Sequence, residues 1–469
     1  MSAARLRAAS GRFTVAVVVG ILLLATGFLV PVEPRLAMAV AGGLLLLGLT
    51  ALRAEALPLA SMATLVVIER VGGDSLNLSA SDAVLFVAFW AAVVLAPRPF
   101  SPPLRALLWL TVVYQVAALF TVIANPYTAN AVEWVHGWLL TGGALVVGWA
   151  VGRSGRASAG LALFVGGSCA IAALTVLSAA VAWASTGELG PVYLDQPWGM
   201  HKNFIGCVLG FAAVVVYARP SWLAWPRSVT WAAFWLCTAG VVASQARQAL
   251  VGLGVAVVVL ALRPEPGRRR NLVVLLAVVP AMVAVVSMVR EQLESGNEFN
   301  SAYTRLTWYQ QAVEVWQSSP WVGIGLRWWT AGRSEYEFQP PNAELEVLTS
   351  TGVVGLVGFL VMMLGSVVVL WRVDRRFGTL AAALVLSRFV QAQFDLFWVS
   401  VQVSVPFVLA GVILGARAWE QARAAPPPTP VDSEPVDPEP VVPEPVVPEP
   451  AVPEPAGPPL RTAPTEVPA

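Results

Sequence analysis

The side chains best suited to chemistry in this chain are a few cationic and hydrogen-bonding residues that border long apolar runs. Arg247 lies in S-Q-A-R-Q, a short hairpin between two such runs. A guanidinium there can hold a phosphate through two parallel hydrogen bonds, although an arginine that only reaches for polar surroundings would occupy the same place. His201, Lys202 and Asn203 open another run, and Lys202 is the only lysine of the chain. Such a group suits the binding of an anion. The alternative is that the single lysine arose by drift in composition and has no function.

A polar segment of about 62 residues, 290–351, is too long for a simple connection and is therefore expected to be functional. It contains four arginines and eight glutamates, so its formal charge is −4 and it is no general basic patch. The arginines are Arg290, Arg305, Arg327 and Arg333, and of these Arg290, Arg305 and Arg327 are candidates for binding a substrate.

Within this segment, Leu306, Tyr309, Val313 and Trp316 follow the spacing of one helical face, and Arg305 precedes them in the first turn. The sequence P-W-V-G-I-G-L then predicts the end of the helix. We expect this helix to lie on a membrane or on a helical bundle, with the tryptophans of the segment at interface depth. Membrane anchoring would explain most of these tryptophans, although indole rings also stack on sugars.

The end of the segment has the features of a second helix start. Pro340 and Pro341 predict an extended entry, Asn342 an N-cap, and A-E-L-E-V-L a short helix that continues into the next apolar run at Gly352. Glu344 falls in the first turn, where the helix dipole favours a carboxylate, and that role alone would account for it.

The apolar runs determine the fold class. The chain has 469 residues, of which 57% are hydrophobic and 12% charged, and runs of 15 to 24 apolar residues recur along most of it. Helices of that length match the hydrocarbon thickness of a bilayer, so we predict an all-α, polytopic transmembrane bundle of 12 to 14 spans. The net charge of +1 excludes a nucleic-acid binder, and the lack of alternation excludes a β-barrel. Three cysteines within the runs and two histidines suggest neither a metal site nor a cofactor.

Charge asymmetry predicts the topology. With a cytoplasmic N-terminus, 20 of the 29 basic residues lie inside, eight outside, and Arg388 within a span. Both termini are then cytoplasmic, and the segment 290–351 is the one large external helical loop. The expected organisation is a cytoplasmic N-terminus (1–12), a transmembrane bundle (13–289), the external loop (290–351), the last spans (352–416) and a disordered Pro/Glu/Val-rich tail (425–469).

One polar set falls inside an expected span, 379–396. Arg388, Gln391 and Asp395 follow the i, i+3, i+7 spacing of one helical face, which should point into the bundle. A network between Arg388 and Asp395 that only holds the bundle together is the simplest interpretation.

Taken together, these motifs resemble the O-antigen ligase and polymerase superfamily of bacterial inner-membrane glycosyltransferases. The resemblance covers roughly residues 190–415 and rests on H-K-N-F-I-G, on S-Q-A-R-Q-A-L-V-G-L, and on a long loop. That loop carries Y-T-R-L, P-W-V-G-I-G and P-N-A-E-L-E-V-L-T-S-T-G in this order.

The resemblance implies a metal-independent transfer of a glycan from an undecaprenyl diphosphate carrier to a glycan or lipid acceptor on the outer face of the cytoplasmic membrane. It implies that Arg247 and Arg305 hold the diphosphate and that Asn342 marks the place where donor and acceptor meet. The family usually has histidine before that asparagine, whereas this chain has Pro341. Glu344, or else His201 from the other external loop, would then have to act as the base.

Two alternatives remain at this stage. A transporter or flippase for lipid-linked or small solutes would place ionisable groups near the midplane, as Arg388 and Asp395 could be. A family member that has lost catalysis and serves as an assembly partner would fit the proline at position 341. The sequence does not distinguish a ligase from a polymerase, nor does it identify the sugar or the acceptor.

Overall fold

The computed structural model describes residues 34–71, 78–95, 98–196, 199–267, 301–336 and 338–424, with Gly27, Leu276, Val283, Ser287, Arg290 and Gly457. The expected spans 13–30 and 271–289 and the repetitive tail fall almost wholly outside these ranges. The chain divides after Ala422, and the first unit, Met1–Ala422, contains the helical bundle. Of the second unit, Arg423–Ala469, the described part is the end of the last helix and Gly457.

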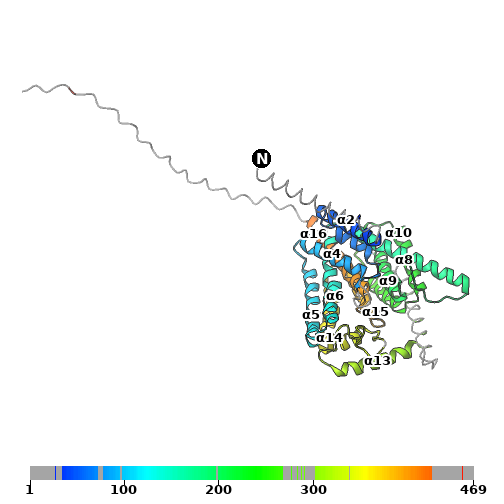
Figure 1. The fold of residues 1–469 in the computed structure, drawn as a ribbon. Helices are drawn as coiled ribbons and strands as arrows, with labels where there is room; N and C mark the ends of the chain where they lie inside the picture. Colours follow the sequence, from blue (N-terminus) through cyan, green and yellow to red (C-terminus); the bar gives the residue numbers. More distant parts are fainter. Residues whose placement is uncertain are drawn as a thin grey trace, which may run out of the picture. The chain divides into compact units, whose positions relative to one another are not determined.

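Within the described residues the apolar runs form helices (Figure 1), and the one sheet described there is a short ribbon. In chain order the elements are α2 (Pro34–Leu52), α3 (Ala56–Thr64), β1 (Arg70–Val71), β2 (Leu78–Ser79), α4 (Ala80–Leu95), α5 (Pro102–Ala124), α6 (Thr128–Trp138), η1 (Leu139–Gly143), α7 (Ala144–Arg153), α8 (Ala157–Thr186), α9 (Lys202–Ala218), η2 (Ser221–Leu223), α10 (Arg227–Ser244), α11 (Arg247–Leu262), α13 (Ser301–Ser318), α14 (Ala343–Arg372), α15 (Arg375–Gln391) and α16 (Ser400–Ala424). The antiparallel ribbon pairs Arg70 with Ser79.

Five helical segments of the described chain are long and apolar enough to cross a membrane: α5, the continuous run α6–η1–α7, α8, α14 and α16. Shorter apolar helices include α4, α9 and α11. Within 18-residue windows, 89% of the residues of the α6–α7 run and of α16 are buried, against 33% for α5. The first two are therefore central, and α5 is peripheral. The all-α polytopic membrane fold predicted from the sequence is confirmed.

Three packed helices connect the two ends of the bundle. α9, α11 and α15 contact one another. α9 and α11 begin at the end where α15 finishes, because Gln248 at the start of α11 hydrogen-bonds Asp395 just beyond α15. At 1.5 Å per residue, helices of 16 or 17 residues are about 25 Å long. Residues at the two ends of this group are thus separated by nearly a bilayer's thickness.

The segment after α13 is hydrogen-bonded into a break in α14. Gly352 has φ +64° and interrupts the helix, which leaves carbonyls and amides without partners inside the helix. The amides of Ile324 and Gly325 donate to the carbonyls of Thr349 and Ser350, and the amides of Val353 and Val354 donate to those of Pro320 and Trp321. A Cβ on Gly352 would lie 2.2 Å from the Trp321 carbonyl carbon, so only glycine allows this approach. The turn that contains Gly323 and Gly325 and the helix break at Gly352 therefore hold each other in place.

The helix expected after Arg305 is α13, and it ends before Pro320 as predicted. In its apolar stripe Leu306 is 49% and Val313 38% exposed, whereas Tyr309 and Trp316 are partly buried. Ala312 and Val315 form the fully buried face, and Trp329 packs on them. The loop folds back over that face of α13, so only part of the predicted stripe packs on protein.

The expected span 379–396 is shorter than predicted. α15 ends at Gln391, and residues 392–399 form a connection to α16, which we call the α15–α16 connection. Asp395 therefore does not share a helical face with Arg388, and the predicted i, i+3, i+7 arrangement is wrong at its last position. The reason is that the backbone of the connection is bound by side chains from other parts of the bundle, as described below.

Candidate functional site

Polar side chains from separate helices meet at the end of the bundle where α9 and α11 begin. They come from the first residues of α9 and α11, from α13, and from the α15–α16 connection. Helix starts expose backbone amides and a positive dipole end, so this region favours anions even before side chains are considered.

Three cations of this region lie within electrostatic reach of one another. The charges of Arg247 at the start of α11 and of Arg305 in α13 both act on the ammonium group of Lys202 at the start of α9. Arg305 also acts on the hydroxyl of Tyr309, one turn further along α13. The sequence singled out the three cations separately, and the structure brings them together. We call Lys202, Arg247 and Arg305 the cationic cluster.

Asp395 is the carboxylate that faces this cluster. Gln248 donates to its Oδ2 from 3.4 Å, the Asn203 side chain hydrogen-bonds it, and Arg305 and Arg388 interact with it electrostatically. It is only 9% exposed, and burial raises its pKa against the opposing influence of these partners. Asn203 thus contacts the carboxylate next to the cations.

The α15–α16 connection is held by two oppositely charged side chains. Arg388 is fully buried and donates to the carbonyls of Phe397 and of Leu396, the latter at 2.6 Å. It also donates to the side-chain oxygen of Gln402 at 2.9 Å. Glu346 in α14 accepts the amide of Phe397 at 2.6 Å. A buried charge with several hydrogen bonds to the backbone fixes that backbone firmly. Arg388 therefore positions the connection that carries Asp395.

His201 acts as the N-cap of α9. Its Nδ1 accepts the amide of Asn203 at 3.2 Å, and its ring lies edge-on to Tyr193 with 5.2 Å between centroids. Burial lowers the pKa of His201, so the imidazole is neutral at pH 7. A neutral ring that accepts at Nδ1 carries its proton on Nε2, where it donates rather than accepts. This arrangement is poorly suited to a general base.

Asn342 is the N-cap of α14, as predicted. Its side-chain oxygen accepts the amide of Leu345 at 3.0 Å, and its Nδ2 donates to the carbonyl of Gln393 at 3.2 Å. Pro341 beside it is buried, and its carbonyl accepts the Tyr309 hydroxyl at 3.4 Å. The asparagine therefore ties α14 to the α15–α16 connection, and Tyr309 ties α13 to the same point.

Glu344 lies in the first turn of α14 with one oxygen engaged. Its Oε1 accepts from the Gln393 side chain at 2.8 Å, while its Oε2 is buried and has no hydrogen-bond partner among the described residues. A carboxylate that is fixed through one oxygen and open at the other is suited to accept a proton from a bound hydroxyl.

The other two predicted site arginines, Arg290 and Arg327, are not members of the cationic cluster. Arg290 is exposed, and its neighbours 291–300 lie outside the described residues. Arg327 is buried and forms an ion pair with Glu133 of α6, at 3.4 Å. Glu133 also lies 3.5 Å from His136, and His136 lies 3.2 Å from Asp82. This buried chain was missed in the sequence, although acidic residues beside apolar runs were a signal for it.

Asp82 ends that chain at the ribbon β1–β2 and α16. It accepts hydrogen bonds from Ser79 and from the Ser400 hydroxyl, the latter at 2.7 Å. Through the described range, no group of three or more His, Cys, Asp or Glu side chains is placed to hold a metal ion.

The chain was compared with known protein families. Residues 232–360 match the family model described as O-antigen ligase. The match contains most of α10, all of α11 and α13 and the first part of α14, and hence Arg247, Arg305, Asn342 and Glu344. His201, Lys202 and Asp395 lie outside it. A search of curated proteins found no match.

Proposed function

We propose that this chain is a member of the O-antigen ligase and polymerase superfamily, on the family match over residues 232–360, and that it transfers a glycan from an undecaprenyl diphosphate carrier to a glycan or lipid acceptor. The reaction would take place at the outer face of the bacterial cytoplasmic membrane and without a metal ion. The observation that carries the proposal is the cationic cluster, since Lys202, Arg247 and Arg305 come from three different helices to one end of the bundle.

The cationic cluster supports the binding of a diphosphate. Two guanidiniums can each form paired hydrogen bonds to phosphate oxygens, and the ammonium adds a point charge. The negative charge on the diphosphate grows as it leaves the sugar, so fixed cations stabilise the transition state more than the ground state. They would supply the charge that a metal ion supplies in other transferases.

The proposed reaction is a single displacement. The acceptor hydroxyl oxygen forms a bond to the anomeric carbon while the bond from that carbon to the diphosphate oxygen breaks, which inverts the configuration. Glu344 takes the hydroxyl proton on Oε2, the oxygen left open by Gln393. His201, whose Nδ1 is occupied by capping, would donate from Nε2 to the substrate.

The test is transfer from purified lipid-linked donor by the full chain in membranes. Arg247→Ala and Arg305→Ala should each lower kcat/KM by about 10- to 100-fold or more, because each removes charge-assisted hydrogen bonds to the leaving group. Lysine at either position should rescue poorly, since it lacks the planar fork. The matched control is Arg333→Ala, in the same loop, where the guanidinium stacks on Tyr127 instead.

Transfer that is unaffected in either alanine variant would remove that arginine from the diphosphate site. The two alternatives are tested by the same assay. A non-catalytic assembly partner would form no product with any donor, whereas a transporter would move the labelled lipid between leaflets and leave its glycosidic bond intact.

A further inference from the structure

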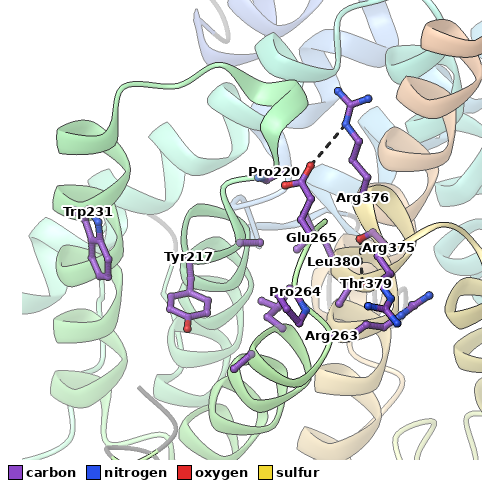
Figure 2. Close-up of a pocket in the computed structure, with 13 residues that line it drawn as sticks. Tyr217, Pro220, Trp231, Arg263, Pro264, Glu265, Arg375, Arg376, Thr379 and Leu380 are labelled. Atoms are coloured by element: carbon purple, nitrogen blue, oxygen red, sulfur yellow. Dashed lines mark hydrogen bonds and ion pairs between the residues drawn. The ribbon is translucent and has the colours of Figure 1, made fainter. Parts of the chain in front are cut away.

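A second polar pocket lies at the opposite end of α9, α11 and α15 from the cationic cluster (Figure 2). Its volume is about 170 Å³, and it is open to solvent. Its walls come from the ends of α9 and α11, from α10, and from the start of α15. The lining includes three arginines, Arg263, Arg375 and Arg376, and one glutamate, Glu265.

The carboxylates described at this end are already paired with other arginines. Arg376 forms ion pairs with Glu420 at 2.6 Å and with Glu265 at 3.6 Å. Asp374 pairs with Arg417 at 2.6 Å. Figure 2 shows Arg376 turned toward Glu265, away from Arg263 and Arg375. These pairings leave the last two arginines as excess positive charge in the pocket.

Arg263 and Arg375 are close enough to repel each other. Burial, and then the charge of Arg375, lower the pKa of Arg263 against the opposing influence of Asp374. Arg263 donates from Nη2 to the Val373 carbonyl at 3.0 Å, and its Nη1 is buried with no partner among the described residues. A buried N–H without an acceptor is costly, so an anion in the pocket would relieve both the orphaned donor and the repulsion.

The remaining wall is largely apolar. Tyr217, Trp231, Leu260 and Leu380 line it. The Arg263 guanidinium also lies 4.5 Å from the ring centre of Trp371, which is 44% exposed at the end of α14. Tryptophan and tyrosine at helix ends are typical of the headgroup level of a bilayer.

We propose that this pocket binds the phosphate headgroup of an anionic membrane lipid, with Arg263 and Arg375 holding the phosphate and the apolar wall holding the first part of the acyl chains. The site is separate from the proposed transfer site, since it lies about 25 Å away along the same three helices. Two guanidiniums beside an aromatic and aliphatic wall suit an amphiphile better than a free ion.

The experiment measures binding to the purified full chain in uncharged detergent by calorimetry. The probes are dioctanoyl phosphatidylglycerol, dioctanoyl phosphatidylcholine and inorganic phosphate. We expect phosphatidylglycerol to bind at least about tenfold more tightly than either of the others, because only it combines a net negative phosphate with chains. Arg375→Gln should weaken its binding by about tenfold or more.

Arg375→Gln is the decisive variant, because among the described residues its guanidinium has no hydrogen bond that the fold would lose. Arg263→Gln should act in the same direction but also loses the contact to Val373, so its thermal unfolding must be measured alongside. Arg227→Gln, an exposed arginine at the same end that does not line the pocket, is the matched control and should bind like the parent chain.

Three results would overturn the proposal. Equal binding of phosphatidylcholine would show that the charge is not recognised, and equally tight binding of inorganic phosphate would show a free-anion site instead of a lipid site. Unchanged binding in Arg375→Gln would place the lipid elsewhere. None of these outcomes bears on the glycan transfer assay, which measures activity at the proposed site at the other end of the bundle.

Discussion

Glu344→Gln is the substitution that tests the proposed proton transfer most directly. Glutamine has the same shape, and its amide oxygen can keep the 2.8 Å hydrogen bond from Gln393. The amide nitrogen would take the place of Oε2, where no described residue donates or accepts. We therefore expect a change in stability of about 1 kcal/mol or less, while the proton acceptor is lost completely.

The kinetic effect should be far larger than the structural one. A positioned general base contributes about 10²- to 10⁴-fold, equal to roughly 3–5 kcal/mol of activation free energy. Glu344→Gln should therefore lower kcat by that factor and leave KM for the lipid-linked donor nearly unchanged, because the donor is held by the cationic cluster. Initial rates at varied donor and acceptor concentration in membranes separate the two parameters.

His201→Gln is the comparison variant, because it removes the other candidate base. It also removes the cap of α9, so we expect about 1 kcal/mol of lost stability but at most a modest fall in kcat. The reasoning fails if Glu344→Gln turns over normally, or if its KM rises while kcat is preserved. A large fall in kcat with His201→Gln would instead transfer the base to the histidine and refute our argument from its capped Nδ1.

The remaining predictions concern charge, topology and packing. Burial raises the pKa of Asp395, and protonation of this carboxylate removes a negative charge from beside the cations. Donor affinity should therefore rise as the pH falls through that pKa. KM for the donor across a pH series measures this dependence, and Asp395→Asn should abolish it. A cysteine at Ala331 should react with an impermeant reagent added from outside, whereas one at Thr429 should not; the reverse pattern would invert the topology. Gly352→Ala should lower stability by about 2 kcal/mol or more in thermal unfolding, since φ is +64° and a backbone carbonyl blocks the Cβ, and Gly166→Ala, where nothing lies within 4 Å, should not.

The features that sequence predicted well are those set by local patterns. Apolar runs became helices because a backbone in lipid must satisfy its hydrogen bonds within the same segment. Asn342 was recognisable as an N-cap because its type and the following A-E-L-E-V-L act within one turn. The same locality explains why the end of α13 before Pro320 was predicted correctly.

The features that sequence missed depend on contacts between distant parts of the chain. Asp395 was assigned to a helical face shared with Arg388, but the helix ends earlier, and the carboxylate meets Gln248, which lies 147 residues away along the chain. The ion pair between Arg327 and Glu133 spans 194 residues. Spacing rules describe neighbours along a helix and contain no information about such pairs.

The proposed base and the carboxylate beside the cations belong to one hydrogen-bonded unit, and this has a consequence for how the site works. α14 begins at Asn342, which bonds the Gln393 carbonyl, and Glu344 bonds the Gln393 side chain. Glu346, two residues after Glu344, accepts the amide of Phe397. Three contacts from the start of α14 therefore set the distance between Glu344, which would accept the proton, and Asp395, which would face the diphosphate. A change in Glu346, which touches neither substrate in the proposed reaction, should for this reason disturb both the base and Asp395 together.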